Sequence, residues 1–190
     1  MSLWEKVNNR SNSTLIVLGI GAIFLVIVLY SSFSRNPGAY ESKLLKAREN
    51  RDLYFKNSPD SPVPRDLKAE FEGLAYFKPN AAFISAATLE RDPQPDTVRM
   101  LMSNGEAEQM LKFGKVTFRL FKKEYSLSAF RTVDAAAGTD LFIPFTDLSS
   151  GNQTYGGGRY LNIPMATPLT IDFNEAYHPD CLYNDGFACP

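Results

Sequence analysis

The pattern of hydrophobic and polar positions changes along the chain. Residues 14–33 form an apolar stretch without a charged side chain. Glu41 to Phe55 lacks Gly and Pro and is rich in Leu, Lys, Arg and Glu, which is typical of a helix. From Ala75 onward a period of two replaces these patterns, in short runs that end at Pro, Gly, Asn or Asp. The pattern therefore predicts an apolar helix, a polar helix and then a region of strands.

The period-two region predicts a mainly β fold. Val116, Phe118 and Leu120 fall on one face of their run, and Tyr125, Leu127 and Ala129 share a face of the next. The connections are too short to hold helices, so we expect an antiparallel sheet that forms a barrel or a sandwich. A tight turn is expected at Lys122-Lys123, although neither residue favours the positive φ of common two-residue turns. The predicted strands are Phe83–Leu89, Thr97–Met102, Lys115–Phe121, Glu124–Phe130, Leu141–Phe145, Tyr160–Ile163 and Leu169–Phe173.

The apolar stretch at 14–33 has the length of a transmembrane helix, which needs about 20 apolar residues. A cleaved signal peptide is the alternative, but its apolar region usually spans about 7–15 residues before small residues at the cut. Here the run is longer and Arg35 follows at once. We therefore predict a retained anchor, which makes the membrane the first expected partner.

Charge and cysteine use give different indications of orientation. Basic residues on both sides of 14–33, with more after it, would place the large domain in the cytoplasm by the positive-inside rule. Those after it alternate with acidic residues on the expected helix, and folded domains translocate largely regardless of charge. Cys181 and Cys189 are the only cysteines, as expected of a single disulfide outside the cytoplasm. We predict an extracytoplasmic, periplasmic domain, with a cytoplasmic orientation left open.

These patterns divide the chain into four parts. We assign an N-terminal tail to 1–13, the anchor to 14–33, a helix with a Pro-rich linker to 34–65, and a β domain to 66–190. A short helical turn is expected at Asp66–Phe71. The formal net charge is −1, with 20 basic and 21 acidic residues, so composition does not favour nucleic-acid binding.

Several motifs make the chain resemble the bacterial and archaeal family known as domain of unknown function 1684. The motifs are R-D-L-Y-F-K-N-S-P at 51–59, F-E-G-L-A-Y-F at 71–77, F-I-P-F-T-D-L-S-S-G-N-Q-T-Y-G-G-G-R-Y-L at 142–161 and D-F-N-E-A-Y-H-P-D-C at 172–181. The resemblance brings no assigned activity. His178 stands where the family more often has Asn. Relatives also usually continue beyond the position of Pro190, so the resemblance implies a truncated C-terminus.

The two later motifs contain the candidate site. The turn after the strand at 141–145 is either a structural loop or a polar face that offers hydroxyl groups to a ligand. Gly156 to Gly158 let the backbone approach closely, and their amides with Arg159 suit an anion; Arg159 pairing with Asp147 or Asp172 is the alternative. The ligand-binding candidates are Asp147, Thr154, Tyr155, Arg159, Tyr160, Asp172, Asn174, Tyr177 and His178.

His178 and the two cysteines allow three interpretations. Asp172, His178 and Cys181 are possible metal ligands, but with one His and no C-x-x-C spacing the sequence favours no metal. A Cys181–His178 nucleophile pair is a second possibility. The third, a disulfide between Cys181 and Cys189, is the one we predict.

Two functional hypotheses follow. In the first, an anchored β domain binds a small polar or anionic ligand, or a protein partner, at a polar face around Arg159. In the second, the domain is a hydrolase that uses Asp147, Arg159, Asp172 and His178. No cofactor is expected, because the glycine run lacks the spacing of a Walker loop or a dinucleotide fingerprint.

Overall fold

A computed structural model describes residues 37–133 and 140–190. The predicted tail at 1–13 and the predicted anchor at 14–33 lie outside the described residues. In the described part, no helix combines the length and the apolar character that a membrane crossing requires. The chain divides into two compact units, Met1–Lys43 and Leu44–Pro190, and the second contains every contact discussed below.

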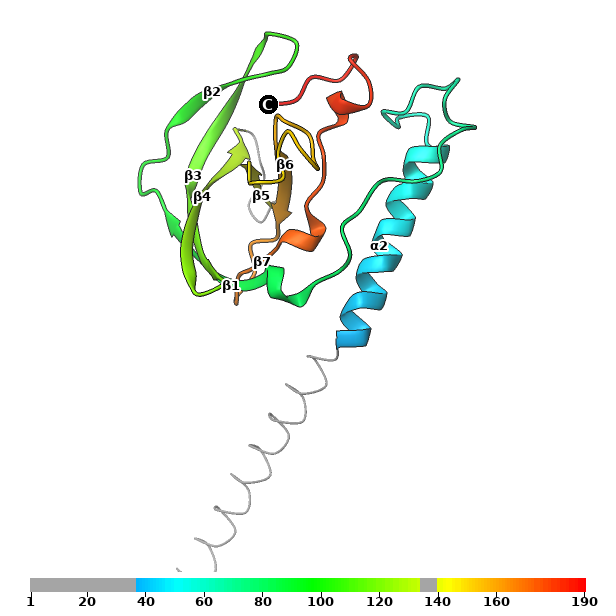
Figure 1. Ribbon diagram of the computed structural model, residues 1–190. Coiled ribbons are helices and arrows are strands. Elements are labelled where there is room, and N and C mark those ends of the chain that lie inside the picture. The colour runs from blue at the N-terminus through cyan, green and yellow to red at the C-terminus, as the bar shows by residue number, and fades with distance from the viewer. Residues whose placement is uncertain (1–36, 134–139) are drawn as a thin grey trace, which may run out of the picture. The chain divides into compact units, whose positions relative to one another are not determined.

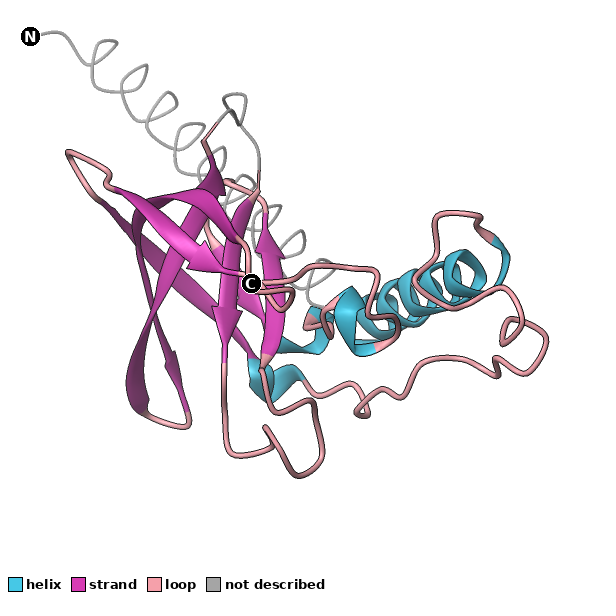
Figure 2. Cartoon of the chain, turned by 90° about the horizontal axis from the view of Figure 1, so that it is seen from above, coloured by secondary structure: helices cyan, strands magenta, loops and turns pink. Residues whose placement is uncertain are grey.

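The second unit confirms the predicted mainly β architecture (Figures 1 and 2). All of the predicted strands are present, most of them with ends shifted by one or two residues. The described elements are α2 (Pro37–Asn57), η1 (Ala81–Phe83), β1 (Ile84–Arg91), β2 (Thr97–Leu101), β3 (Ala107–Leu120), β4 (Lys123–Thr132), β5 (Leu141–Phe145), β6 (Arg159–Ile163), β7 (Thr170–Asp172), η2 (Phe173–Glu175) and η3 (Asp180–Leu182).

The sheet is antiparallel and curls into a nearly closed barrel. Its strand order over the described residues is β6-β5-β4-β3-β1-β7, and β2 pairs with the first half of β3. Just after β7, Tyr177 forms an antiparallel bridge with Tyr160 of β6. This bridge brings the chain that follows β7 against β6, the strand at the opposite edge of the sheet.

The interior of the barrel follows from the alternation seen in the sequence. Val116 and Phe118 of β3 are buried, as predicted, and they belong to the same core cluster as Leu141 and Ile143 of β5 and Leu161 of β6. Strand β5 alternates buried and half-buried positions along its length. Burial of these aliphatic and aromatic side chains is the main stabilising contribution to the barrel.

Strand β3 is longer than the sequence indicates, because Gly114 does not end it. A bulge between Lys112 and Gly114 lets the strand continue. A Cβ at Gly114 would lie 2.2 Å from the carbonyl oxygen of Glu90, so only glycine permits this close approach of β1. The glycine therefore marks a close approach of two paired strands rather than a strand boundary.

The hairpin between β3 and β4 exists, but its turn is one residue earlier than predicted. Phe121 and Lys122, not Lys122 and Lys123, are the turn residues, with φ of 49° and 67°. Both residues are in the left-handed region that two-residue hairpins require and that glycine or asparagine adopts more readily.

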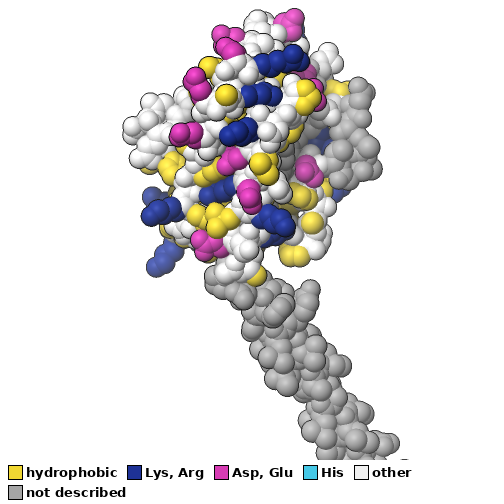
Figure 3. All heavy atoms as spheres, turned by 90° about the vertical axis from the view of Figure 1, so that its right-hand side faces the viewer, with side chains coloured by type: hydrophobic (Ala, Val, Ile, Leu, Met, Phe, Trp, Pro, Cys, Tyr) yellow, Lys and Arg dark blue, Asp and Glu magenta, His cyan; other side chains and the backbone are white. Residues whose placement is uncertain are grey.

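Helix α2 confirms the predicted polar helix and extends it to Pro37 and Asn57. Phe55 is 1% exposed and its ring meets the rings of Phe71 and Tyr183, so this side chain fastens the helix to the C-terminal segment. The outward face of the helix carries interleaved basic and acidic side chains (Figure 3). Contacts from α2 therefore concentrate on the side that faces residues 71–80 and 173–183.

Candidate functional site

Three arginines lie over aromatic rings where α2 meets the barrel. Arg48 lies over Tyr76, Arg51 over Phe55 and Tyr177, and Arg159 over Phe77 and Phe145, with guanidinium-to-centroid distances of 4.6–5.4 Å. We call these residues the arginine–aromatic cluster: Arg48, Arg51, Arg159, Phe55, Tyr76, Phe77, Phe145 and Tyr177. Cations over ring faces are attracted by the ring quadrupole, more strongly where water is excluded.

Arg159 is held by the turn that precedes β6. Gly158 has φ of 102°, and a Cβ there would lie 2.5 Å from the carbonyl oxygen of Phe145, so glycine is needed at this close turn. The Arg159 side chain is 11% exposed, and its Nη2 donates to Asp147 Oδ2 at 2.7 Å. Partial burial acts to raise the pKa of Asp147, but hydrogen bonds from Ser149 and the charge of Arg159 outweigh it and lower that pKa. Asp147 therefore stays ionised beside Arg159.

Arg51 is the least compensated of the three arginines. It is half-buried, and it forms no ion pair within 4.0 Å across residues 37–133 and 140–190. Its Nε is buried and has no hydrogen-bond partner in the same part of the chain, which is also true of the Nε atoms of Arg48 and Arg159. The carboxyl of Asp180 lies near enough for Arg51 to lower its pKa, but burial raises that pKa by more. The charge of Arg51 is thus offset chiefly by the rings of Phe55 and Tyr177.

Arg48 has a structural role. Its Nη1 donates to the Phe77 carbonyl at 2.8 Å, and its Nη2 donates to the Asn174 carbonyl at 3.0 Å. These bonds join α2 to the extended segment 71–80 and to η2. Both terminal nitrogens of this guanidinium therefore bind backbone carbonyls within the fold.

His178 lies near enough to Arg159 and Arg51 for both charges to affect its pKa. Its Nε2 accepts a long hydrogen bond of 3.5 Å from the Tyr155 amide. Burial lowers the pKa of His178, and the cations Arg159 and Arg51 lower it further. The imidazole is therefore neutral near pH 7, and because Nε2 accepts, its proton is on Nδ1.

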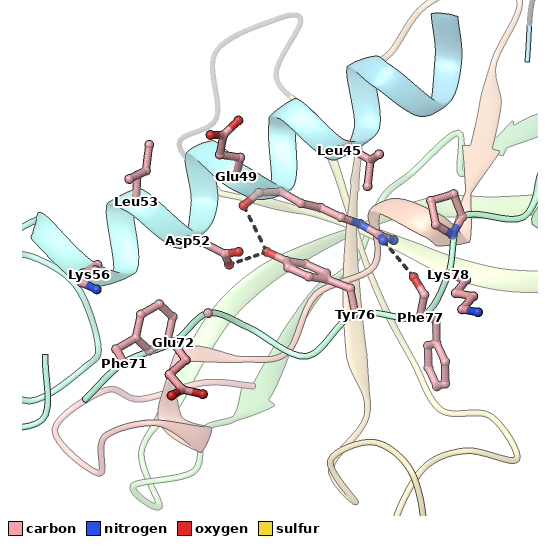
Figure 4. Close-up of a pocket in the computed structure, with 13 residues that line it drawn as sticks. Leu45, Glu49, Asp52, Leu53, Lys56, Phe71, Glu72, Tyr76, Phe77 and Lys78 are labelled. Carbon is pink, nitrogen blue, oxygen red and sulfur yellow. Dashed lines mark hydrogen bonds between the residues drawn. The ribbon is translucent and has the colours of Figure 1, made fainter. Parts of the chain in front are cut away.

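A groove of about 550 Å³ lies between α2 and residues 71–79 (Figure 4). Tyr76 projects from this segment toward α2, and its hydroxyl donates to Asp52 Oδ1 at 3.1 Å. Burial and the Asp52 carboxylate raise the pKa of Tyr76, so the phenol stays protonated. The charged residues that line the groove are Arg48, Lys56, Lys78, Glu49, Asp52 and Glu72. This even mixture of signs gives the groove no preference for an anion.

Comparison with known proteins assigns the chain to a family. Residues 69–190 match the family model described as "Protein of unknown function (DUF1684)". The chain belongs to this family. A solved relative, the solution NMR structure of an uncharacterised protein of Haloarcula marismortui, is 33% identical and has a TM-score of 0.62, covering 80% of this chain and 85% of its own. Curated proteins include no match to this chain.

The structure brings together part of the predicted site of this DUF1684 domain. Asp147, Tyr155, Arg159 and His178 meet at one face, as described above. Thr154 instead contacts its own loop, with Oγ1 3.0 Å from Ser149 Oγ. This favours the structural interpretation for the tip of the turn.

The other candidates serve mainly to fasten segments together. Tyr160 donates its hydroxyl to the Pro190 carbonyl, and Tyr177 accepts from Asn162 Nδ2 at 2.9 Å. Burial raises the pKa of both tyrosines, so both phenols remain neutral. These two side chains hold the chain after β7 against β6.

Asp172 and Asn174 form a second set of contacts. Asp172 Oδ1 accepts from the Asn174 amide at 2.9 Å and caps η2. Asn174 in turn accepts from the Asn80 amide and donates to the Asn80 carbonyl. Of the two partners considered for Arg159, Asp147 is the one it pairs with.

Neither Cys181 nor Cys189 is in a disulfide in this structure, although the Cys181 amide contacts the Cys189 sulfur. Within the described residues, no group of three or more His, Cys, Asp and Glu side chains is arranged to hold a metal ion.

Sequence reasoning missed Arg48, Arg51 and Phe77. Arg48 and Arg51 are three positions apart on a predicted helix, a spacing that puts two side chains on the same face. Arg51 also opens the motif at 51–59 by which the family resemblance was identified. That combination is the signal that was available for them.

Proposed function

We propose that this DUF1684 domain binds a small anionic ligand at Arg51, Arg159 and His178. The observation that carries the proposal is Arg51: a half-buried guanidinium over two rings, with no carboxylate within 4.0 Å in the described residues. Removing a cation from water is costly unless an opposite charge compensates it. A bound carboxylate, phosphate or sulfate group would supply that charge, with the paired hydrogen bonds that a guanidinium forms well.

The neighbouring groups suit an anion. Arg159 uses one nitrogen for Asp147 and adds positive potential at His178. The neutral imidazole provides an N–H donor without a charge that Arg51 and Arg159 would repel. The rings of Phe55 and Tyr177 fix the plane of the Arg51 guanidinium, which reduces the entropy lost on binding.

The single histidine of the chain offers a direct test, because its ring gives one set of imidazole signals in a proton NMR spectrum. The full-length protein would be titrated with sodium sulfate and, separately, with sodium acetate, at constant ionic strength with chloride as the balancing anion. An anion between the two arginines removes their repulsion of the imidazolium, so we expect binding to raise the pKa of His178. A response to sulfate alone would identify a tetrahedral anion, and a response to acetate alone a carboxylate.

Two matched variants make the test specific. We expect Arg51→Gln to weaken binding by about tenfold or more, since it removes a charge-assisted hydrogen bond. Arg91→Gln is the control, because Arg91 also lies over an aromatic ring, that of Phe113, at 5.5 Å. Equal binding by Arg51→Gln and the unaltered protein would refute the proposal. So would a His178 pKa that neither sulfate nor acetate changes.

We also propose that residues 14–33 anchor this domain to a membrane with the β domain outside the cytoplasm. The length and uncharged character of this segment support the anchor, and the pair of cysteines in the β domain supports the orientation. Cells that express the full chain would be fractionated and the membranes washed with alkaline carbonate, which removes peripheral proteins. We expect the chain to stay in the membrane and the β domain to be cut by protease added to spheroplasts. Release by carbonate would contradict the anchor, and protection in intact spheroplasts would contradict the orientation.

A further inference from the structure

The two cysteines meet near the end of the described chain, eight positions apart in sequence. The Cys181 amide donates to Cys189 Sγ at 3.2 Å, and the two thiols are within hydrogen-bonding reach of each other. The chain has no other cysteine. The fold therefore brings both of its thiols to one place.

The fold holds Cys189 at this position through its backbone. The Cys189 amide donates to Ser103 Oγ at 3.1 Å, and the Ser103 amide donates to the Cys189 carbonyl at 2.7 Å. Ser103 lies in the turn between β2 and β3. The next residue, Pro190, accepts a hydrogen bond from the Tyr160 hydroxyl of β6. Cys189 is thus fixed to the barrel, and Cys181 of η3 reaches it from the segment that follows His178.

We infer that Cys181 and Cys189 are a redox modification site, which a small-molecule disulfide converts reversibly to an intramolecular disulfide. Close approach of two thiols in a fixed geometry gives a high effective concentration for closing the bond. The inference rests on this contact and on the Ser103 bonds, and it is independent of the proposed anion site.

The chemistry needs an external disulfide such as oxidised glutathione. Cys181 is the more accessible thiol, so its thiolate attacks first, forming a mixed disulfide and releasing one glutathione thiolate. Cys189 then loses its proton and attacks the Cys181 sulfur, which releases the second glutathione thiolate. Two protein thiols are oxidised to one disulfide, and one oxidised glutathione is reduced to two thiols.

Closure would link η3 covalently to the residue that Ser103 holds. The segment 177–183, which contacts Arg51 and Phe55, would then be connected more firmly to the β2–β3 turn. Burial raises the pKa of the Cys189 thiol, so the reduced Cys189 is protonated at neutral pH.

The equilibrium with glutathione tests the inference. The full chain, folded in mild detergent and unfolded in urea, would be equilibrated in mixtures of reduced and oxidised glutathione. We expect the equilibrium constant for closure to be at least about tenfold larger in the folded protein, because the fold brings the thiols together. Closure would be read as loss of both free thiols and of two hydrogens from the intact mass. Chymotrypsin cuts after aromatic residues such as Tyr183 and Phe187, so it should leave two peptides that stay linked until reduction.

Two variants separate the pair from ordinary thiol reactivity. Cys189→Ser should end as a mixed disulfide of Cys181 with one glutathione. Ser103→Ala removes one of the two Ser103 bonds to Cys189 and should lower the folded-state constant several-fold. Equal constants for the folded and unfolded chain would overturn the inference. A second kind of result would also overturn it, in a buffer in which the unfolded chain forms the disulfide. There, the folded protein would keep both free thiols, take up two glutathiones or dimerise.

Discussion

The barrel interior is buried and the arginine–aromatic cluster is only partly buried, and the two are built in opposite ways. In the interior, Val116, Ala129, Leu141 and Ile143 are 0% exposed and come from strands that are neighbours in the sheet. The cluster takes its cations from α2 and β6, and its rings from α2, residues 71–80, β5 and the chain after η2.

The two regions also differ in what their burial contributes. Apolar side chains stabilise the fold by leaving water, and the effect needs no particular partner. A guanidinium loses hydration when it is covered, so it adds stability only where rings, carbonyls or carboxylates replace the water. Arg48 and Arg159 have such partners, whereas Arg51 is incompletely compensated. A group of this kind is better explained by binding than by stability.

The largest expected effect tests whether the two regions unfold together. Phe55→Ala removes the ring that joins α2 to Phe71 and Tyr183. We expect the free energy of unfolding to fall by about 3–5 kcal/mol, the usual cost of deleting a buried phenylalanine. Urea unfolding monitored by circular dichroism measures the loss.

Hydrogen exchange in the same variant shows where the loss occurs. If α2 and the barrel form one cooperative unit, amides in α2 and in β5 will both exchange faster. Faster exchange confined to α2 would show that the cluster is a separable layer on a barrel that stands without it.

A slightly smaller loss is expected inside the barrel. Ile143→Ala leaves a cavity at a position with 0% exposure, and it should cost about 2–4 kcal/mol. Because Ile143 is absent from the arginine–aromatic cluster, anion binding should persist wherever the variant remains folded. Calorimetric titration with sulfate, below the unfolding transition, checks this; loss of binding would show that the two regions are coupled.

The barrel could be predicted from sequence because its determinants are local. Alternation from Val116 to Leu120 indicates which face of β3 is buried without reference to any distant residue. The pattern holds less well in β4, because Ala129 is buried whereas Tyr125 is 44% exposed. Bulges and turn register were missed, since Gly114 and Phe121 depend on the approach of a neighbouring strand.

The cluster is different because its contacts span long separations. Arg48 binds the carbonyl of Asn174, 126 positions away, and no local pattern encodes that pairing. Sequence reasoning identified Arg159, Asp147 and His178 because they belong to two dense polar motifs. It missed Arg51, which appears as one more basic residue on a polar helix.

A pair of substitutions sharpens the contrast within the cluster. Arg51→Met keeps the length of the side chain and removes a charge without a close carboxylate, so we expect stability to rise by about 0–1 kcal/mol while anion binding is lost. Asp147→Asn leaves the Arg159 charge without its carboxylate, and should cost about 1–2 kcal/mol, since Asp147 is 40% exposed. Thermal unfolding and sulfate titration measure both properties. A strongly destabilised Arg51→Met would mean that its stacking on Phe55 and Tyr177 is structural.

The smallest expected effect is a pH dependence caused by His178. Its pKa in the folded protein is lowered from 6.5, by burial first and then by Arg159 and Arg51. The unfolded chain therefore binds more protons as the pH falls below 6.5, so the imidazole makes stability decrease with falling pH and has no such effect above that value. His178→Asn, which keeps a polar side chain but removes the titrating imidazole, should flatten the change between about pH 7 and about pH 5.5. The difference should be under about 1 kcal/mol, because the ring is only half-buried.

The free energy of unfolding, measured by urea unfolding at several pH values, would check this prediction. Sulfate should reduce the dependence of stability on pH in the unaltered protein by stabilising the imidazolium. If stability changed with pH equally in His178→Asn and in the unaltered protein, the imidazole would lie outside the field of the two arginines. His178 would then drop out of the proposed anion site, which would consist of Arg51 and Arg159.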